Sequence, residues 1–175
     1  MYINNEDICL RAVEVEDNDL LRDMMNDPSI EQMTFGWSFP ISKKNQIEWY
    51  ENFLNSERDA KWIIQSNELS KSIGMIGLTN IDFKNGNAEL HIKLSNDNVK
   101  QKGFGYQAVT LLSDYCFNQL RLHCIYVEIL EYNVASLGLF RKCGFTQEAR
   151  LQDRVFKNGR FNNVLILSKI KKVED

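Results

Sequence analysis

Residues 100–105 read Lys100-Gln101-Lys102-Gly103-Phe104-Gly105, between a stretch with the alternation of a strand and a stretch with the period of a helix. The two glycines let backbone N–H groups approach a ligand with no Cβ in the way. The helix start adds a partial positive charge, and the two lysines add full ones. The stretch therefore predicts an anion site suited to a pyrophosphate, although a plain strand-to-helix turn would use glycine here as well.

Two familiar phosphate-binding motifs fit this stretch poorly. A dinucleotide-binding βαβ unit has a third glycine and begins with an early strand, whereas residues 100–105 follow what the sequence predicts to be an antiparallel hairpin in mid-chain. A P-loop ends in Gly-Lys-Ser or Gly-Lys-Thr, and this stretch does not.

The first quarter of the chain predicts one strand and two helices. Residues 8–15 predict the strand, and Asp17 has the side chain of an N-cap for a helix that runs to Met25, which Pro28 helps to end. Ser42 has the same role for the second helix. That helix has a broad apolar face made of Ile47, Trp49, Tyr50, Phe53 and Leu54.

The middle of the chain predicts three strands, at residues 61–65, 72–83 and 88–94, with Asn85-Gly86 as a tight hairpin turn. Alternation is clearest in the third strand. One face of it carries Ala88, Leu90, Ile92 and Leu94, and the other carries Glu89, His91 and Lys93.

The last part predicts helices at residues 103–120 and 133–142 with a strand at 125–130 between them. Asn133 is a good N-cap for the second helix, and Gly144 sits where a left-handed C-cap glycine belongs. Two further strands, 145–155 and 161–170, are joined by an Asn-Gly turn. Strands in the centre with two helices near the end predict a mixed sheet in an α/β or α+β domain.

Composition limits the classes of function. A chain of 175 residues predicts one domain, and a net charge of -3 argues against nucleic acid as a main partner. The four cysteines show no C-x-x-C spacing and there are two histidines, so we predict no metal site and reduced thiols. The sequence opens without a signal peptide and has no apolar run of ~18 residues. These features predict a cytoplasmic protein with no membrane partner.

Two motifs together resemble the signatures of the GNAT superfamily of N-acetyltransferases. Lys100-x-x-Gly103-x-Gly105, with Ala108 following in a helix, resembles Arg/Gln-x-x-Gly-x-Gly/Ala. Residues 133–145, Asn-Val-Ala-Ser-Leu-Gly-Leu-Phe-Arg-Lys-Cys-Gly-Phe, resemble Asn-x-x-Ala-x-x-x-Tyr-x-x-x-Gly-Phe. Residues 8–12 and 74–77 also resemble family landmarks, so the likeness spans essentially the whole chain and looks like the ribosomal-protein and polyamine acetyltransferase branch.

The resemblance implies a single N-acetyltransferase domain over residues 1–175. Its fold would be α/β (α+β mixed), with a GNAT-like central mixed, mostly antiparallel sheet flanked by helices. The resemblance also implies acetyl-CoA as cosubstrate, with the first motif on the pyrophosphate and the end of the preceding strand on the pantetheine arm. The cofactor contacts carried over in this way are Leu94, Ser95, Lys100, Gln101, Lys102, Gly103, Phe104, Gly105, Asn133 and Phe140. Lys100 keeps the charge of the usual arginine but not its planar fork.

Catalysis would join a thioester and an amine. An aliphatic amine of pKa near 10.4 is neutral in only roughly one molecule in 10³ at pH 7, so a base must take its proton, directly or through water. Glu89 is our candidate base, with His91 beside it, because both lie on the polar face of the strand that leads to the first motif. In the branch that the chain resembles, a glutamate occupies the matching strand position. A solvated strand face is the alternative interpretation.

Phe140 is the clearest departure from the family pattern. The family usually has tyrosine here, which can protonate the departing thiolate, and phenylalanine cannot. Tyr132, Tyr106 or water could take that role, and a thiol of pKa ~8.5 already leaves moderately well as thiolate. Packing of Phe140 on Phe145 is a structural explanation for the residue.

The predicted substrate loop, residues 35–45, is aromatic and basic, with Glu31 and Glu48 flanking it. A polyamine pocket would want several carboxylates, so an amino-sugar nucleotide suits the loop better. A protein N-terminus and a plain hydrophobic anchor for a lid helix also stay open. The predicted function is therefore an N-acetyltransferase acting on the primary amine of a small molecule, an amino sugar or a polyamine, or on a protein N-terminus, with a homodimer left open. The alternative is a non-catalytic acyl-CoA-binding regulatory module that has lost its general acid.

Overall fold

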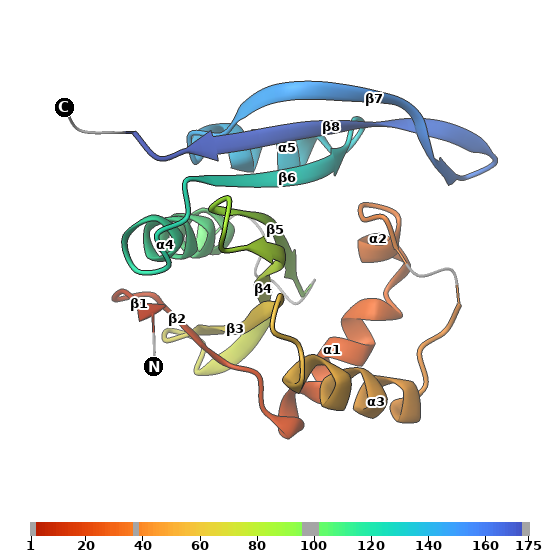
Figure 1. Cartoon of the computed structure of the whole chain (residues 1–175). Helices are drawn as coiled ribbons and strands as arrows, with labels where there is room; N and C mark the ends of the chain where they lie inside the picture. Colours follow the sequence, from red (N-terminus) through yellow and green to blue (C-terminus); the bar gives the residue numbers. More distant parts are fainter. Residues whose placement is uncertain (1–2, 37–38, 96–101, 173–175) are drawn as a thin grey trace.

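A computed structural model describes residues 3–36, 39–95 and 102–172 of the chain. Its centre is an eight-stranded sheet with the order β1-β2-β3-β4-β5-β6-β8-β7 (Figure 1). The strands are β1 (Ile3–Asn4), β2 (Ile8–Ala12), β3 (Ala60–Ser66), β4 (Lys71–Asp82), β5 (Asn87–Leu94), β6 (Cys124–Leu130), β7 (Thr146–Lys157) and β8 (Arg160–Ile170). The helices are α1 (Asn18–Met25), α2 (Pro28–Glu31), α3 (Lys43–Leu54), α4 (Phe104–Asn118) and α5 (Val134–Lys142), with a 3-10 turn η1 (Val15–Asp17) before α1.

The sheet is antiparallel at every junction except one. β5 and β6 run parallel, and α4 provides the crossover that a parallel pair requires. Their pairing is short: it joins Asn87 to Cys124 and ends with Glu89 opposite Tyr126. Beyond that point the two strands separate, so the sheet splits into two halves that open like a V (Figure 1). The mixed, mostly antiparallel sheet predicted from the sequence is confirmed.

The two faces of the sheet are covered differently. A large apolar core lies on the side of α4 and α5, where Ile76, Leu90 and Leu112 are fully buried. A smaller cluster lies on the side of α1 and α3, where Trp49, Tyr50 and Phe53 pack over Ile63 and Met75. Figure 1 shows α2 at the open side of the split, beneath the far end of the β7–β8 hairpin. Both layers therefore follow from strand alternation, which sends neighbouring side chains to opposite faces.

Local details of the sequence prediction needed correction in the helices. Asp17 stands at the N-cap position of α1, but its side chain makes no capping hydrogen bond. Both carboxylate oxygens instead accept hydrogen bonds from the Arg11 guanidinium, each at 2.7 Å, because a buried carboxylate is better compensated by a bidentate cation than by one helix N–H. In α3, Ile47 and Leu54 are 37% and 59% exposed, so the buried face is narrower than predicted. Ser42 does cap α3, accepting from the Asn45 N–H.

The two hairpin turns differ from one another. Asn158 and Gly159 both have positive φ, at 53° and 76°, which is the two-residue turn predicted between β7 and β8. The turn between β4 and β5 is longer than the predicted Asn85-Gly86 pair and takes four residues, 83–86. The Asp82 carboxylate accepts from the N–H groups of Lys84 and Asn85 and organises that longer turn.

Candidate active site

The start of α4 presents free backbone donors. Gly103 is the N-cap residue with φ +81°, a conformation that favours glycine, and among the described residues no side chain caps this helix. The first helical hydrogen bond runs from the Gln107 N–H to the Gly103 carbonyl, which leaves the N–H groups of Phe104, Gly105 and Tyr106 without a partner inside the helix. This arrangement suits an anion, and the anion site stays a prediction.

Packing brings this helix start against the end of β5. A Cβ on Gly105 would lie 3.3 Å from a Leu139 methyl and 3.4 Å from a Leu94 methyl, so the glycine permits the close approach. The Phe104 ring is buried in the core, while Lys102 is exposed with its Nζ 3.7 Å from Glu68. Lys100 and Gln101, two further predicted cofactor contacts, lie outside the described residues.

The end of β5 has backbone groups directed into the split. The Ser95 N–H donates to the Ile73 carbonyl at 2.8 Å, so that amide is used by β4. In an antiparallel ladder such bonded pairs alternate with pairs whose groups point outward. With Leu94 opposite Gly74, the alternation directs the backbone groups of Ile92 and Leu94 toward β6, which has already separated. This edge can pair with an extended ligand that carries amides of its own.

The polar face of β5 is half-buried, which argues against a solvated strand face. Glu89, His91 and Lys93 lie on the face of β5 opposite Leu90, and at Lys93 this face meets Met25 of α1 and the residues around α2. His91 sits over Gly77, where a Cβ would come within 2.8 Å of the ring. Burial, followed by the charges of Lys61 and Lys93, lowers the pKa of His91 to about 3. The imidazole is therefore neutral at physiological pH and can accept a proton only weakly.

Glu89 lies at the point where β5 and β6 separate. Burial raises its pKa above the ordinary value, and the charge of Glu128 raises it further, against a hydrogen bond from Asn80 at 3.3 Å. Tyr126, opposite Glu89 in the register, has a pKa raised by burial and by both carboxylates. A carboxylate with a raised pKa beside a split in the sheet has the properties of a general base.

Two of these neighbours were missed from the sequence. Tyr126 and Glu128 alternate with the buried residues Ile125, Val127 and Ile129 along β6, so the strand's period does mark them as one face. What the period could not show is that β6 lies parallel to β5 with Tyr126 beside Glu89. The pairing, which is set by the whole fold, brings the two carboxylates onto one surface.

The second motif is integrated with the α2 segment. Asn133 caps α5 by accepting from the Ser136 N–H at 3.1 Å, and its Nδ2 donates to the Met33 carbonyl at 2.9 Å. The Tyr132 hydroxyl donates to the Gln32 carbonyl at 2.6 Å. Tyr132 therefore has its proton engaged by the backbone, which weakens it as a substitute acid.

Phe140 is 1% exposed and packs edge-to-face on Phe145, with ring centroids 5.1 Å apart, as the structural explanation of that residue predicted. Tyr106, the other tyrosine considered as an acid, is partly exposed on α4, with the Lys142 ammonium 4.8 Å from its ring centroid.

The predicted substrate loop is largely on the surface. Phe35 and Phe39 are 40% and 71% exposed, and Trp37 lies outside the described residues. Lys44 forms an exposed ion pair with Glu48 at 3.6 Å in α3. Residues 31–33, at the end of α2 just before this loop, are held in place from the other half of the sheet. Their main-chain carbonyls accept hydrogen bonds from Tyr132, Asn133 and Lys157.

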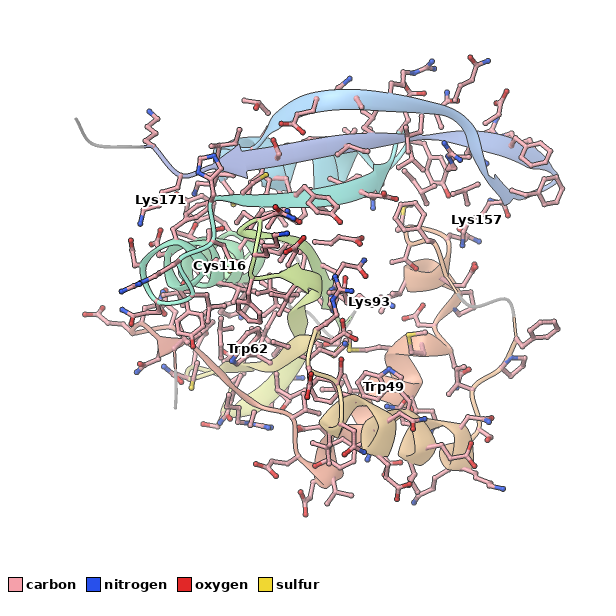
Figure 2. The ribbon with its side chains drawn as sticks, in the orientation of Figure 1. Trp49, Trp62, Lys93, Cys116, Lys157 and Lys171 are labelled. Atoms are coloured by element: carbon pink, nitrogen blue, oxygen red, sulfur yellow. The ribbon has the colours of Figure 1, made fainter. Side chains whose placement is uncertain are left out.

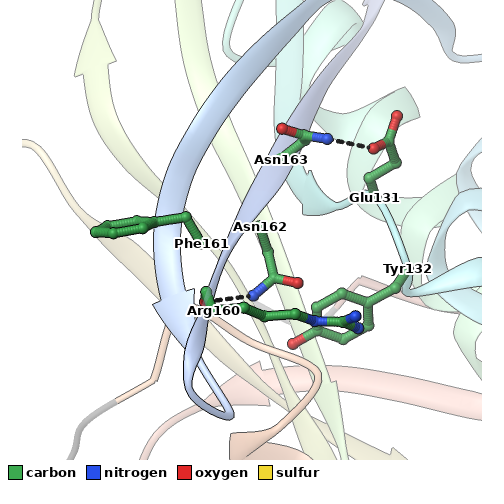
Figure 3. A pocket seen from close by; sticks show the side chains of 6 residues that line it. All are labelled: Glu131, Tyr132, Arg160, Phe161, Asn162 and Asn163. Carbon is green, nitrogen blue, oxygen red and sulfur yellow. Dashed lines mark hydrogen bonds between the residues drawn. The ribbon is translucent and has the colours of Figure 1, made fainter.

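A separate polar cleft of about 310 Å³ lies where the β7–β8 hairpin meets the loop after β6 (Figure 3). Its walls are Glu131, Tyr132, Arg160, Phe161, Asn162 and Asn163. The Glu131 carboxylate is already bonded to Arg150 and to Asn163. Of the residues considered for catalysis only Tyr132 lines this cleft, and its hydroxyl is bonded to the Gln32 carbonyl. Glu89, His91 and the described cofactor residues do not line it, so it is not the candidate active site.

Comparison with known proteins agrees with this geometry. Residues 7–146 match the family model described as an acetyltransferase (GNAT) domain, so the chain belongs to the GNAT acetyltransferase family, whose members transfer an acetyl group to an amine. It is 26% identical over 161 residues to the spermidine N(1)-acetyltransferase of Vibrio cholerae serotype O1, covering 91% of each chain. It is 31% identical over 169 residues to an uncharacterized N-acetyltransferase, p20, of Bacillus licheniformis, covering 95% of this chain and 94% of that one.

The fold comparison gives the same family. The crystal structure of spermidine N-acetyltransferase from Vibrio cholerae in complex with CoA and spermine superposes with a TM-score of 0.88 at 25% identity, over 95% of this chain and 96% of that chain.

Among the described residues, no helix has both the length and the apolar composition of a membrane span. Nor do the described residues contain a cluster of histidine, cysteine and acidic side chains able to hold a metal ion.

Proposed function

We propose that this acetyltransferase uses acetyl-CoA and a primary amine, and that its reaction takes place in the split between β5 and β6. The observation that supports this most is the uncapped N-terminus of α4, which packs against the end of β5 where β6 has separated, with Glu89 at the last position where β5 still pairs with β6. The raised pKa of Glu89 agrees with this arrangement. The N–H groups of Phe104, Gly105 and Tyr106 would hold the pyrophosphate. The outward backbone groups of Ile92 and Leu94 would pair with the pantetheine arm.

Glu89 would act on the acceptor amine. The ammonium gives up a proton to the carboxylate, and the neutral nitrogen forms a C–N bond to the acetyl carbon while the C–S bond breaks. The electron pair of the C–S bond leaves with sulfur as thiolate, and the thiolate takes, directly or through water, the second proton that the nitrogen loses as it becomes an amide. The charge of Glu128 strengthens the affinity of this carboxylate for the proton, and Tyr126 lies opposite Glu89 in the register. His91, neutral at physiological pH, would position the amine rather than carry charge.

The relatives suggest which amines to test first. The Vibrio cholerae protein acts on spermidine and its crystal structure holds spermine, so aliphatic primary amines are the first class. The alternative function, an acyl-CoA-binding module without turnover, is favoured by one observation, the burial of Phe140 where the family usually has a tyrosine acid. Turnover separates the two functions, because a binding module would bind acetyl-CoA and release no thiol.

The test has two parts. Thermal unfolding with acetyl-CoA should show a stabilisation of about 2.7 kcal/mol at 100 times its Kd. Gly103→Glu should abolish that shift, because φ +81° disfavours any side chain and a negative charge would face the pyrophosphate. Lys84→Glu, at an exposed turn position, is the matched control and should leave the shift unchanged. Thiol release with a panel of primary amines then measures turnover, and no shift at millimolar acetyl-CoA would refute the assignment.

A further inference from the structure

Lys93 is a cation in an unusual setting. Its side chain lies on the half-buried face of β5, and its Nζ is 3.2 Å from the Met25 sulfur. It helps to line a narrow pocket between β5 and the first two helices, with Met24, Met25, Ile30, Glu31, Thr34 and Gly36. Figure 2 labels Lys93 and Lys157 on the side of the sheet that α1 and α2 occupy. A charged amine in mainly apolar surroundings requires a counter-ion.

The carboxylate that could neutralise Lys93 is already paired. Lys157 Nζ donates to both the side chain and the main-chain carbonyl of Glu31, the latter at 2.6 Å. The turn at Gly36 closes over this pair, since a Cβ there would lie 2.6 Å from the Glu31 carboxylate and 2.8 Å from Lys157 Nζ. Within residues 3–36, 39–95 and 102–172, no carboxylate lies within ion-pair distance of Lys93. Burial and the charge of Lys157 lower the pKa of Lys93.

The charge of the side chains on the polar face of β5 therefore changes along the strand, from an acidic residue at one end to a basic residue at the other. Glu89 provides a carboxylate at the split, His91 is neutral, and Lys93 provides an uncompensated cation. Residues four apart on a strand are roughly 13 Å apart at their Cα atoms. An acceptor whose amine reacts at Glu89 and which extends along this face would meet Lys93 with its far end.

We infer that Lys93 selects acceptors that carry an anionic group, a carboxylate or a phosphate, at the end remote from the reacting amine. The inference rests on the proposed function and specifies its substrate class. An anion beside Lys93 gains a partner shielded from water, where charge pairs are stronger than at the surface. A polyamine would place its second ammonium beside Lys93 and near Lys157, where like charges repel. The chain would in this respect differ from its spermidine-acetylating relatives.

The test compares acceptors of one chain length in the thiol-release assay: an α,ω-diamine, an ω-amino acid and an ω-aminoalkyl phosphate. We expect the wild type to show a kcat/KM for the amino acid or the phosphate on the order of tenfold or more above that for the diamine, the scale of one partly shielded charge pair. A preference for the carboxylate over the phosphate, or the reverse, identifies which anion fits. Lys93→Glu should reverse the order in favour of the diamine, and Lys93→Gln should reduce the ratio to near one.

Controls keep the outcomes distinct. Lys84→Glu makes the same charge change in the exposed turn between β4 and β5 and should leave the ratio unchanged. The acetyl-CoA thermal shift shows that each Lys93 variant is folded with its cofactor site intact, and Lys93→Gln serves if Lys93→Glu does not fold. A wild type that prefers the diamine, or a ratio that Lys93→Gln leaves unchanged, overturns the inference while the proposed function stands. Release of no thiol with any amine overturns both.

Discussion

The two faces of β5 differ in burial, charge and neighbours although their residues alternate along one strand. Ala88 and Leu90 are fully buried under α4, where a leucine contributes about 1.5–3 kcal/mol by leaving water. Glu89, His91 and Lys93 are half-buried on the opposite face, where desolvation shifts each pKa in the direction that favours the neutral form of the side chain. The apolar face therefore stabilises the fold, whereas the polar face carries ionisable side chains whose charged forms are disfavoured by burial.

The burial of ionisable side chains at a cost in stability indicates that the polar face of β5 has a functional role. A face selected for stability alone would be apolar, because buried charged groups are costly unless paired, and perturbed pKa values gather at sites of chemistry. The sheet also separates beside this face, since β5 and β6 pair only as far as Glu89 and Tyr126. The even-numbered residues of the strand thus contribute to stability, and the odd-numbered residues provide the groups proposed for chemistry. Substitutions on the two faces should have opposite consequences.

The largest effect should come from the polar face. Glu89→Gln removes the proposed base, so turnover should fall ~10²–10⁴-fold while acetyl-CoA binding changes little. Folded Glu89 has a pKa above that of the unfolded chain, so its ionisation opposes folding at neutral pH, and the neutral amide should leave stability unchanged or slightly higher. Initial rates and thermal melting measure both. Glu57→Gln, at an exposed position, is the control, and a near-normal rate for Glu89→Gln would remove this residue from the mechanism.

The opposite result is expected one residue further along β5. Leu90→Ala removes a fully buried side chain from the core beneath α4 and should lower the free energy of unfolding by ~2–5 kcal/mol. The rate per folded molecule should stay near that of the wild type, because this side chain does not face the split. Urea unfolding and active-site titration separate the two quantities. A rate loss as large as that of Glu89→Gln would contradict the division between the faces.

Much of this division could be predicted from the sequence. Alternation along residues 88–94 assigned each side chain to its face, and the Asn158-Gly159 turn placed the final hairpin. These signals are local, because the period and the turn chemistry act within a few residues. The glycines of the first motif and the N-cap Asn133 were found in the same way. Each is a residue type that the local backbone conformation at a helix start favours.

What could not be predicted depends on pairing between distant parts of the chain. No local pattern sets the register of β5 against β6, so Glu128 was not recognised as a neighbour of Glu89. Asp17 was assigned to a helix cap because the local pattern allows it, whereas the fold brings Arg11 to the same carboxylate. The bond of Lys157 to Glu31, which leaves Lys93 without that partner, joins residues 126 positions apart. Such contacts arise from tertiary packing rather than propensity.

A pH measurement sharpens the comparison within the polar face. Glu89 must be ionised to accept a proton, and burial together with Glu128 raises its pKa, so kcat/KM should decline on the acid side at a pH above that expected for an ordinary glutamate. Glu128→Gln removes the repelling charge and should move that limb to lower pH. His91 should not contribute, since its pKa of about 3 keeps it neutral across the range. An acid limb that does not move in Glu128→Gln would show that the two carboxylates are uncoupled.

The smallest effect on rate is expected on the apolar side, at Phe140. Restoring the family's hydroxyl by Phe140→Tyr tests whether the core beneath α5 also takes part in the chemistry. The ring is 1% exposed and packs edge-to-face on Phe145, so an added oxygen without a partner should lower stability by ~1–3 kcal/mol. Thiolate is a fair leaving group, so we expect single-turnover acetyl transfer at saturating acetyl-CoA to change by less than about tenfold, the scale of 1.4 kcal/mol in a barrier. A larger gain would mean that the missing acid limits the natural protein, and that the division between a stabilising face and a reactive face ends at this helix.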